Sequence, residues 1–187
     1  MKRTIARYIG YPSHDWMRGT YIMKTLKFLR ESQSWDEDRI KNYQLAKIKK
    51  LVKYAYQNIP YYKNLFDRNS ILPQDIKTFA DFKKIPILSK DIVRRENQNL
   101  TAADVEKSKN VILGLTGGTT GLSLNIYKDH NTRSFVWGSF YRWYDWIGIE
   151  LGDPLLFIKG GIDSHSAENV KNKLKDFLQN TATINIF

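Results

Sequence analysis

The sequence predicts an α/β protein, with a mostly helical region over residues 1–100 and the beginning of an α/β domain over residues 101–187. Three observations lead to this prediction. Apolar side chains recur at helical spacing in the first half of the chain. Two β-prone segments flank a Gly/Thr-rich loop at residues 114–124. A strand–helix–strand pattern then runs from residue 155 to residue 187.

Composition limits the class of protein. The chain has 187 residues and is 42% hydrophobic, which is enough to form a core in one large domain or two small ones. It has no cysteine, which excludes disulfides and thiolate metal sites and fits a reducing, cytoplasmic location. No stretch approaches the roughly 18 apolar residues of a membrane span, and the first ten residues lack the apolar run of a signal peptide.

The net charge of +11 arises from 30 Lys and Arg residues against 19 Asp and Glu residues. One interpretation is neutralisation of nucleic-acid phosphates. The lysines are scattered, however, and neither an arginine-rich arm nor a zinc-finger or RRM signature is present. We therefore favour a solvated basic surface that attracts anionic ligands, and no specific nucleic-acid partner is expected. A nucleic-acid or membrane-surface protein remains the less favoured alternative.

Residues 16–31 are predicted to be helical. Their apolar face carries the following residues: Tyr21, Ile22, Thr25, Leu26 and Leu29. Basic residues surround this face, so the helix is expected either to dock on its own domain or to contact an anionic membrane surface peripherally. We favour docking. The next helix is predicted to begin at Ser34, with Glu37 in the capping-box position.

The helix that follows has a stripe at steps of three and four, formed by Leu45, Ile48, Val52, Ala55 and Ile59. Pro60 is predicted to end this helix, and residues 61–66 to form a short aromatic one. Two brief helices are expected at residues 76–82 and 89–96, joined by an extended link, with Ser89 capping the second.

The Gly/Thr-rich loop is the strongest functional signal. A strand is predicted before it at residues 111–113, and the period-two pattern from Leu124 to Lys128 predicts a strand after it. Glycines allow tight turns and close approach, while threonine hydroxyls and backbone N–H groups can surround a phosphate. The candidate phosphate-binding residues are Thr116, Gly117, Gly118, Thr119, Thr120 and Gly121. A strand after the loop argues against a Walker A loop, and Thr116 breaks the Rossmann glycine pattern. An ordinary Gly-rich hairpin is the alternative.

The remaining segment is read in three parts. Residues 132–147 are predicted to form an aromatic-rich helix buried on nearly every side, or alternatively the wall of a substrate pocket. After a turn, a strand at 155–158 is followed by a helix at 167–178, whose predicted buried stripe is Val170, Leu174, Phe177 and Leu178. A second strand is predicted at 181–187. Two strands leave a parallel sheet unsupported, so the chain is expected to be a fragment truncated at its C-terminus.

These residues resemble a known family. Residues 116–124 are similar to the phosphate-binding loop of adenylate-forming enzymes, [ST]-[SG]-G-[ST]-T-G-x-P-[LM]. Residues 55–62, Ala-Tyr-Gln-Asn-Ile-Pro-Tyr-Tyr, resemble the A-Y-x-N-V-P-Y-Y segment of phenylacetate–CoA ligase-like proteins. Residues 82–90 resemble their L-x-x-L-P-I-L-[ST]-K segment, and residues 148–153 their G-x-x-x-G-D turn. The branch most similar includes capsular polysaccharide biosynthesis (CapK-like) proteins.

The resemblance implies the start of an incomplete adenylate-forming (ANL-type) large domain. It implies an activity in which a carboxylic acid and Mg·ATP form an acyl-adenylate, which is then transferred to coenzyme A or another acceptor. It also implies that Thr116, Thr119 and Thr120 contact the β/γ-phosphates, while Gly117, Gly118 and Gly121 let the loop fold over them. ATP, Mg²⁺ and coenzyme A are the implied cofactors, and a nucleotide and a carboxylic acid are the implied partners.

Two positions depart from the family pattern. Ser123 replaces the usual proline, and Leu122 replaces a lysine often found before it, which removes a cation near the leaving pyrophosphate. The family's acidic Mg²⁺ motif, ribose-binding aspartate and mobile lysine cannot be assigned in residues 1–187, so no catalytic residue is predicted and this chain alone is expected to be inactive. A truncated, binding-only relative is the alternative. His14, His130 and His165 are too dispersed to predict a metal site.

Overall fold

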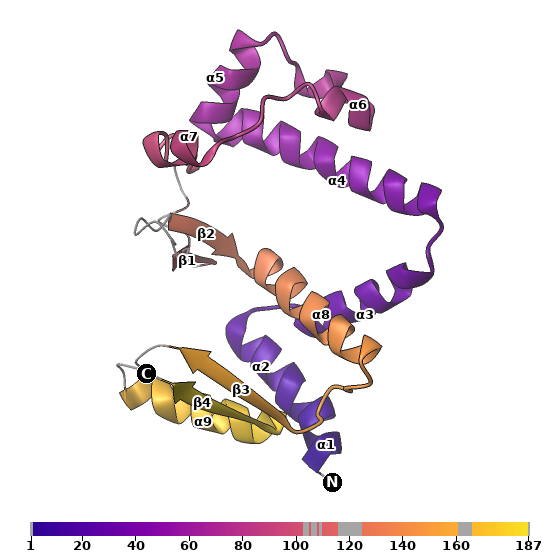
Figure 1. Ribbon diagram of the computed structural model, residues 1–187, viewed down its shortest axis with the longest axis vertical. Helices are drawn as coiled ribbons and strands as arrows, with labels where there is room; N and C mark the ends of the chain where they lie inside the picture. The colour runs from indigo at the N-terminus through magenta and orange to yellow at the C-terminus, as the bar shows by residue number, and fades with distance from the viewer. Residues whose placement is uncertain are drawn as a thin grey trace. The chain divides into compact units, whose positions relative to one another are not determined.

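The computed structural model describes residues 2–102, 105, 108, 110–115, 125–160 and 166–186 (Figure 1). Among these described residues helices predominate, with two small sheets, in agreement with the predicted α/β class. The helices are α1 (Lys2–Ile5), the π-helix η1 (Ala6–Gly10), α2 (Tyr11–Arg18), α3 (Ile22–Glu31), the 3₁₀-helix η2 (Ser32–Ser34), α4 (Glu37–Asn58), α5 (Pro60–Arg68), the 3₁₀-helix η3 (Pro73–Asp75), α6 (Phe79–Phe82), α7 (Lys90–Arg95), α8 (His130–Trp146) and α9 (Ser166–Gln179). The strands are β1 (Val111–Leu115), β2 (Asn125–Asp129), β3 (Leu155–Gly160) and β4 (Thr181–Ile186).

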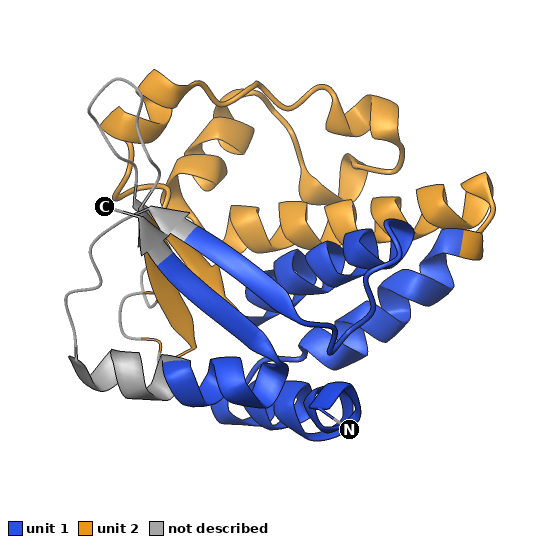
Figure 2. Cartoon of the chain, turned by 60° about the horizontal axis from the view of Figure 1, so that its bottom comes forward, with its two compact units in different colours: residues 1–33, 130–187 blue, residues 34–129 orange. Residues whose placement is uncertain are grey.

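The chain divides into two compact units, shown in different colours in Figure 2. Unit 1 contains residues 1–33 and 130–187, and unit 2 contains residues 34–129. Unit 1 is therefore assembled from the two ends of the sequence. The boundary near residue 100 that the sequence suggests concerns the domains of the whole protein, and it stays a prediction.

The core of unit 1 forms where helices from both ends of the sequence meet. Its buried apolar residues are Ala6, Tyr11, Ile22, Leu26, Tyr141 and Leu151. The rings of Tyr11 and Tyr141 meet edge to face, with centroids 5.3 Å apart. Burial, together with neighbouring Tyr144, raises the pKa of Tyr11 to about 12.

The predicted helix at residues 16–31 is interrupted. Gly19 adopts a left-handed conformation (φ 61°) that ends α2, and α3 begins only at Ile22. Four of the five residues predicted to form the apolar face are buried: Ile22, Thr25, Leu26 and Leu29. Tyr21 is 59% exposed, so its assignment to that face is wrong, because it lies in the turn before the helix. The buried face packs against α8, so the expected docking within the chain is confirmed.

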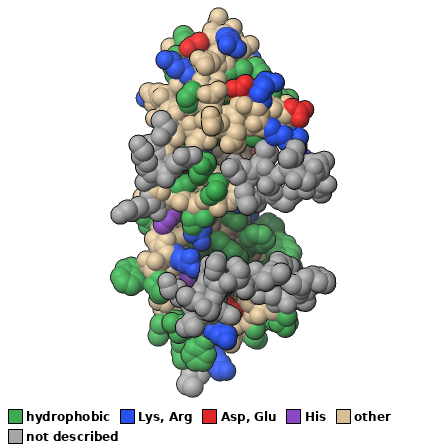
Figure 3. Space-filling model, turned by 90° about the vertical axis from the view of Figure 1, so that its left-hand side faces the viewer, with side chains coloured by type: hydrophobic (Ala, Val, Ile, Leu, Met, Phe, Trp, Pro, Cys, Tyr) green, Lys and Arg blue, Asp and Glu red, His purple; other side chains and the backbone are tan. Residues whose placement is uncertain are grey.

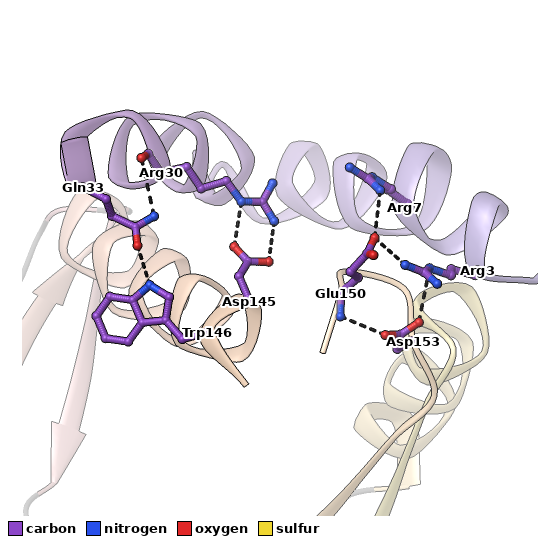
Figure 4. Close-up of polar contacts among 8 residues, drawn as sticks. All are labelled: Arg3, Arg7, Arg30, Gln33, Asp145, Trp146, Glu150 and Asp153. Atoms are coloured by element: carbon purple, nitrogen blue, oxygen red, sulfur yellow. Dashed lines mark hydrogen bonds and ion pairs between the residues drawn. The ribbon is translucent and has the colours of Figure 1, made fainter. Parts of the chain in front are cut away.

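Helices α3 and α8 approach closely because Gly138 has no side chain. A Cβ at Gly138 would lie 3.1 Å from Thr25 Cγ2 and 3.3 Å from Leu29 Cδ1. Hydrogen bonds also connect the C-terminal ends of α3 and α8. As Figure 4 shows, Arg30 donates two hydrogen bonds of 2.7 Å to the Asp145 carboxylate. These contacts join residues more than one hundred positions apart in the sequence.

A second polar group ties the N-terminus to the turn after α8. Arg3 contacts the carboxylates of Glu150 and Asp153, and Arg7 lies 3.5 Å from Glu150 (Figure 4). The Glu150 N–H donates to Asp153 at 2.8 Å, which closes the turn. Because these side chains are substantially exposed, each pair contributes at most about 1 kcal/mol.

Strands β3 and β4 form a parallel pair joined by α9, as the sequence predicts. The register runs from Leu155 opposite Thr181 to Gly160 opposite Ile186. The predicted buried stripe of α9 is wrong at two positions, because Leu174 is 53% exposed and Phe177 is 76% exposed. Helix α9 instead meets η1 near its C-terminal end, where a Cβ at Gly10 would lie 2.0 Å from the Leu178 carbonyl oxygen.

In unit 2, the long helix α4 begins three residues after Ser34. Its N-cap is Asp36, whose carboxylate accepts a 2.7 Å hydrogen bond from the Arg39 N–H. The predicted Ser34–Glu37 capping box is wrong, because Ser34 already belongs to η2. Pro60 begins α5 immediately after α4 ends, so the predicted break and the short aromatic helix are both confirmed.

The core of unit 2 contains Val52, Phe66 and Ile76, which are 3%, 1% and 2% exposed. Half-buried residues pack around this core: Ile48, Tyr56, Tyr62, Leu65, Ile71 and Ile85. The predicted helix at 76–82 begins later than expected, because Ile76 enters the core and Thr78 caps α6. Ser89 caps α7 as predicted, accepting from the Ile92 N–H at 3.3 Å.

The capping box of α6 gives a pH prediction. Lys84, the Thr78 hydroxyl and the Thr78 N–H bond to the Asp81 carboxylate and hold its pKa well below the usual value. A lowered pKa in the folded state means that the carboxylate stabilises α6 above the unfolded pKa of about 3.9 and loses this effect as pH falls through the folded pKa. We expect an NMR titration of Asp81 to have its midpoint well below 3.9, and a midpoint at or above that value would contradict the capping box.

On the face shown in Figure 3, Lys and Arg side chains are scattered among acidic and hydrophobic ones rather than gathered into one patch. Within the described ranges, none of the helices combines the length and the apolar character that crossing a bilayer requires.

Candidate phosphate-binding hairpin

Strands β1 and β2 form the antiparallel hairpin that the sequence predicts around the Gly/Thr segment (Figure 1). The register runs from Val111 opposite Asp129 to Leu115 opposite Asn125. The chain after the Gly/Thr segment therefore continues into a strand. A Walker A loop continues directly into a helix, so this arrangement differs from it, as expected.

The candidate residues Thr116, Gly117, Gly118, Thr119, Thr120 and Gly121 all lie outside the described residues, and their phosphate contacts stay a prediction. The structure describes their anchor points. Leu115 and Asn125 are directly paired, so the segment 116–124 joins two neighbouring strand ends. The hairpin fixes where this segment leaves and re-enters the sheet.

Lys128 on β2 is a cation of the hairpin that the sequence did not single out. It pairs with Ile112, but its side chain extends toward Gly114, two residue pairs nearer the loop. A Cβ at Gly114 would lie 3.5 Å from Lys128 Cε and 3.6 Å from its Nζ. The missing side chain of Gly114 therefore leaves room for the ammonium. The period-two pattern placed Lys128 on the face of Ile126, but only the register shows that it crosses Gly114.

The hairpin also exposes apolar surface on both faces. Ile112 and Ile126 share the face of Lys128 and are 42% and 41% exposed, whereas Leu113, on the opposite face, is 51% exposed. Alternation along an antiparallel pair explains this division. Chemically, the described part of the hairpin offers one extended cation and apolar surface beside the predicted phosphate segment.

The two described histidines, His14 and His130, lie in different environments. His130 Nδ1 lies 2.7 Å from the Gly19 carbonyl oxygen, at the start of α8. His14 is half-buried on α2, and burial together with Arg18 and Lys175 lowers its pKa. His165 lies outside the described residues. In the part of the chain that the structure describes, no three His, Cys, Asp or Glu side chains are grouped as metal ligands would be.

Helix α8 contradicts the prediction of burial on nearly every side. Its buried residues are Ser134, Gly138 and Tyr141, which lie on the side facing α3. The opposite side lines an open groove of about 610 Å³, formed by Phe135, Val136, Ser139, Phe140 and Trp143. Phe140 and Trp143 are 48% and 49% exposed. The dense aromatic pattern therefore serves a core on one side and an apolar surface on the other.

Comparison with known proteins gives a partial match. No family model matches the chain. It is 33% identical over 85 residues to a phenylacetate–coenzyme A ligase from Aromatoleum evansii. It is 30% identical over 84 residues to phenylacetate–coenzyme A ligases from Escherichia coli (strain K12) and Pseudomonas putida. The matched segments cover 45–46% of this chain and 19% of each relative, so the chain spans about a fifth of their length. This similarity supports the adenylate-forming ligase family for the matched part of the chain.

Proposed function

We propose that this chain is the N-terminal part of an ATP-dependent ligase that activates a carboxylic acid. In the proposed reaction, a carboxylate oxygen attacks the α-phosphorus of ATP, and pyrophosphate leaves to give an acyl-adenylate. The thiol of coenzyme A, or another acceptor, then attacks the acyl carbon and AMP leaves. The observation that carries the proposal is the Gly/Thr segment, which joins paired strand ends beside Lys128 in a chain similar to three phenylacetate–coenzyme A ligases.

The proposed role of the hairpin is to hold the β/γ-phosphates of ATP. Hydroxyls of Thr116, Thr119 and Thr120 and backbone N–H groups of the glycines would offset the phosphate charge as the carboxylate approaches. Mg²⁺, when bound with ATP, supplies further neutralisation of the phosphates. We assign no residue of this chain as a Mg²⁺ ligand, because the described residues contain no suitable cluster.

Lys128 supports the proposal because it can supply the positive charge that is missing at Leu122, where the family often has a lysine. The resemblance implies that a lysine beside the loop often neutralises the leaving pyrophosphate, and this chain has leucine there. Lys128 carries a flexible cation over Gly114 toward the same end of the hairpin. A lysine acts as a mobile point charge, so it can serve a phosphate from a different backbone position.

We propose an aromatic or otherwise apolar acid as the substrate. The relatives are named for phenylacetate, and the hairpin itself exposes apolar side chains at Ile112, Leu113 and Ile126. Pyrophosphate exchange measured with a panel of apolar and polar acids, in the full-length protein, tests the choice.

Within the adenylate-forming enzymes, we place the chain in the capsular polysaccharide biosynthesis branch, acting in the cytoplasm, with its ANL-type domain beginning near residue 101. A binding-only relative is the alternative.

The loop gives a direct prediction. Replacing Thr119 and Thr120 together with alanine is expected to weaken Mg·ATP binding by about 30-fold, since two hydrogen bonds to charged oxygens contribute about 2 kcal/mol together. Isothermal titration calorimetry on the 187-residue chain measures this. The control is Thr4→Ala, which removes an exposed threonine from α1. Unchanged affinity in the double variant would contradict the assignment of the loop.

Nucleotide binding and pyrophosphate exchange are expected to require different lengths of the protein. Because the matched segment covers only 19% of each relative, the 187-residue chain is expected to bind nucleotide without catalysing pyrophosphate exchange. Exchange by the full-length protein, with none from this chain, agrees with the acid-activating proposal. Nucleotide binding without exchange in the full-length protein, across the acid panel, favours the binding-only alternative.

A further inference from the structure

Unit 2 contains a groove whose charged lining is entirely positive. Helix α4 forms one wall, and η3 with the residues after it forms the other; the two elements are in direct contact. The groove has a volume of about 420 Å³, within the range of small-molecule sites. Its lining includes three lysines, Lys49, Lys53 and Lys77, and two glutamines, Gln57 and Gln74.

The three lysines come from both walls. Lys49 and Lys53 lie one turn apart on α4, so their ammonium groups repel each other, and Lys77 adds a third cation from the opposite wall. Among the described residues, none of these ammonium groups forms an ion pair. Three like charges gathered in one concave surface create a positive potential that attracts anions.

The carboxylates near the groove lie outside its lining. Asp67 accepts a 2.9 Å hydrogen bond from the Tyr56 hydroxyl, and Asp81 accepts from Thr78, Lys84 and the Lys77 N–H. Asp75 belongs to η3, between Gln74 and Ile76. None of these residues belongs to the lining, so the charged side chains that line the groove among the described residues are the three lysines.

The rest of the lining suits a phosphate-bearing molecule. The side chains of Gln57 and Gln74 can donate N–H groups to phosphate oxygens, and each lysine offers three donors. Ile76, which is only 2% exposed, and Tyr56 supply an apolar base fixed by the unit 2 core.

We propose that this groove is a second anion site, which binds the phosphate groups of a small organic phosphate or of a lipid headgroup. The site does not depend on the acid-activating activity proposed for the hairpin. It uses Lys49, Lys53 and Lys77 as cations and the two glutamines as neutral donors. Because the lysines are exposed, binding is sensitive to salt and weakens as ionic strength rises.

The test uses inorganic pyrophosphate as the soluble probe, measured by isothermal titration calorimetry at low salt. To weaken binding at the hairpin, the titrations are done in the Thr119→Ala/Thr120→Ala background. In that background, Lys49→Gln/Lys53→Gln is expected to weaken binding about tenfold and Lys77→Gln about threefold, the effects expected for exposed charge pairs. Glutamine has a helix propensity close to that of lysine, so α4 is expected to remain folded.

The matched control is Lys50→Gln, which removes the same charge from α4 at an exposed position outside the groove. Unchanged affinity in this control supports the site. Equal weakening by Lys50→Gln would show a diffuse charge effect and overturn the proposal, as would the absence of pyrophosphate binding in the background variant. Loss of binding from the groove variants, with Mg·ATP binding retained in the chain with an intact loop, separates this site from the hairpin.

A vesicle assay identifies the source of the phosphate. Vesicles containing phosphatidate are compared with neutral vesicles, using the same groove variants and the same Lys50→Gln control. Vesicle binding that depends on Lys49 and Lys53 supports a lipid headgroup as the ligand. Binding of soluble pyrophosphate without vesicle binding supports a small organic phosphate, and vesicle binding that is indifferent to the groove variants overturns the lipid assignment.

Discussion

Replacing Gly10 with alanine is expected to lower the free energy of unfolding by about 3 kcal/mol, with a fall in Tm of roughly 10 °C. The added Cβ would lie 2.0 Å from the Leu178 carbonyl oxygen and 2.6 Å from its carbonyl carbon. These are backbone atoms, which cannot rotate away as a side chain can. Helix α9 would have to move away from η1, and the buried contacts between them would be lost.

The sign of this effect is diagnostic. In an exposed helix interior, changing glycine to alanine stabilises a protein by up to about 1 kcal/mol. Urea denaturation followed by circular dichroism measures the difference. Gly114→Ala is the control, because its Cβ meets neighbouring atoms no closer than 3.5 Å, an ordinary contact distance. If Gly10→Ala proved as stable as the control, the close packing of η1 on α9 would be wrong.

Local signals predicted much of the fold correctly. Pro60 separates α4 from α5, Ser89 caps α7, and β3, α9 and β4 follow one another as expected. The hairpin strands around the Gly/Thr segment were likewise predicted, from period-two alternation and glycine content. In each case the residues that determine the element are close together in the sequence. A helix cap acts within the first turn of its helix, and strand alternation repeats every two residues.

The errors arise where distant residues decide the outcome. Helical spacing does not show which side of α8 will be covered, and in this structure α3 covers the side of Ser134 and Gly138 only. The stripe of α9 fails for the same reason, since its contact with η1 lies near Leu178 rather than at Phe177.

The candidate site shows the same limit. The loop residues were predicted from their types, but Lys128 required the strand register, since its relation to Gly114 crosses from one strand to the other. The groove of unit 2 was also not predicted, because Lys77 joins Lys49 and Lys53 only through the contact between η3 and α4. Residue types indicate chemistry, whereas the grouping of charges depends on tertiary contacts.

Asp15 performs a capping role that sequence spacing does not reveal. Helix α3 begins at Ile22, and its own N-cap residue, Tyr21, supplies no side-chain cap. The Asp15 carboxylate, seven residues earlier on α2, accepts from the Ile22 N–H at 2.9 Å and from the Met23 N–H at 2.8 Å. It also accepts from the Thr20 hydroxyl. One buried carboxylate, 7% exposed, thus fixes the turn and satisfies the first donors of α3.

Replacing Asp15 with alanine is therefore expected to lower the free energy of unfolding by about 3 kcal/mol, because a hydroxyl and two N–H groups lose a charged partner at a buried position. Asp15→Asn retains one acceptor oxygen and is expected to cost about half as much. The comparison is Asp36→Ala, which removes a single exposed cap from α4 and is expected to cost about 1 kcal/mol. Urea denaturation measures all three variants. If Asp15→Ala were no more destabilising than Asp36→Ala, the carboxylate would not organise the turn, and the entry into α3 would depend on the packing of Ile22 and Leu26 instead.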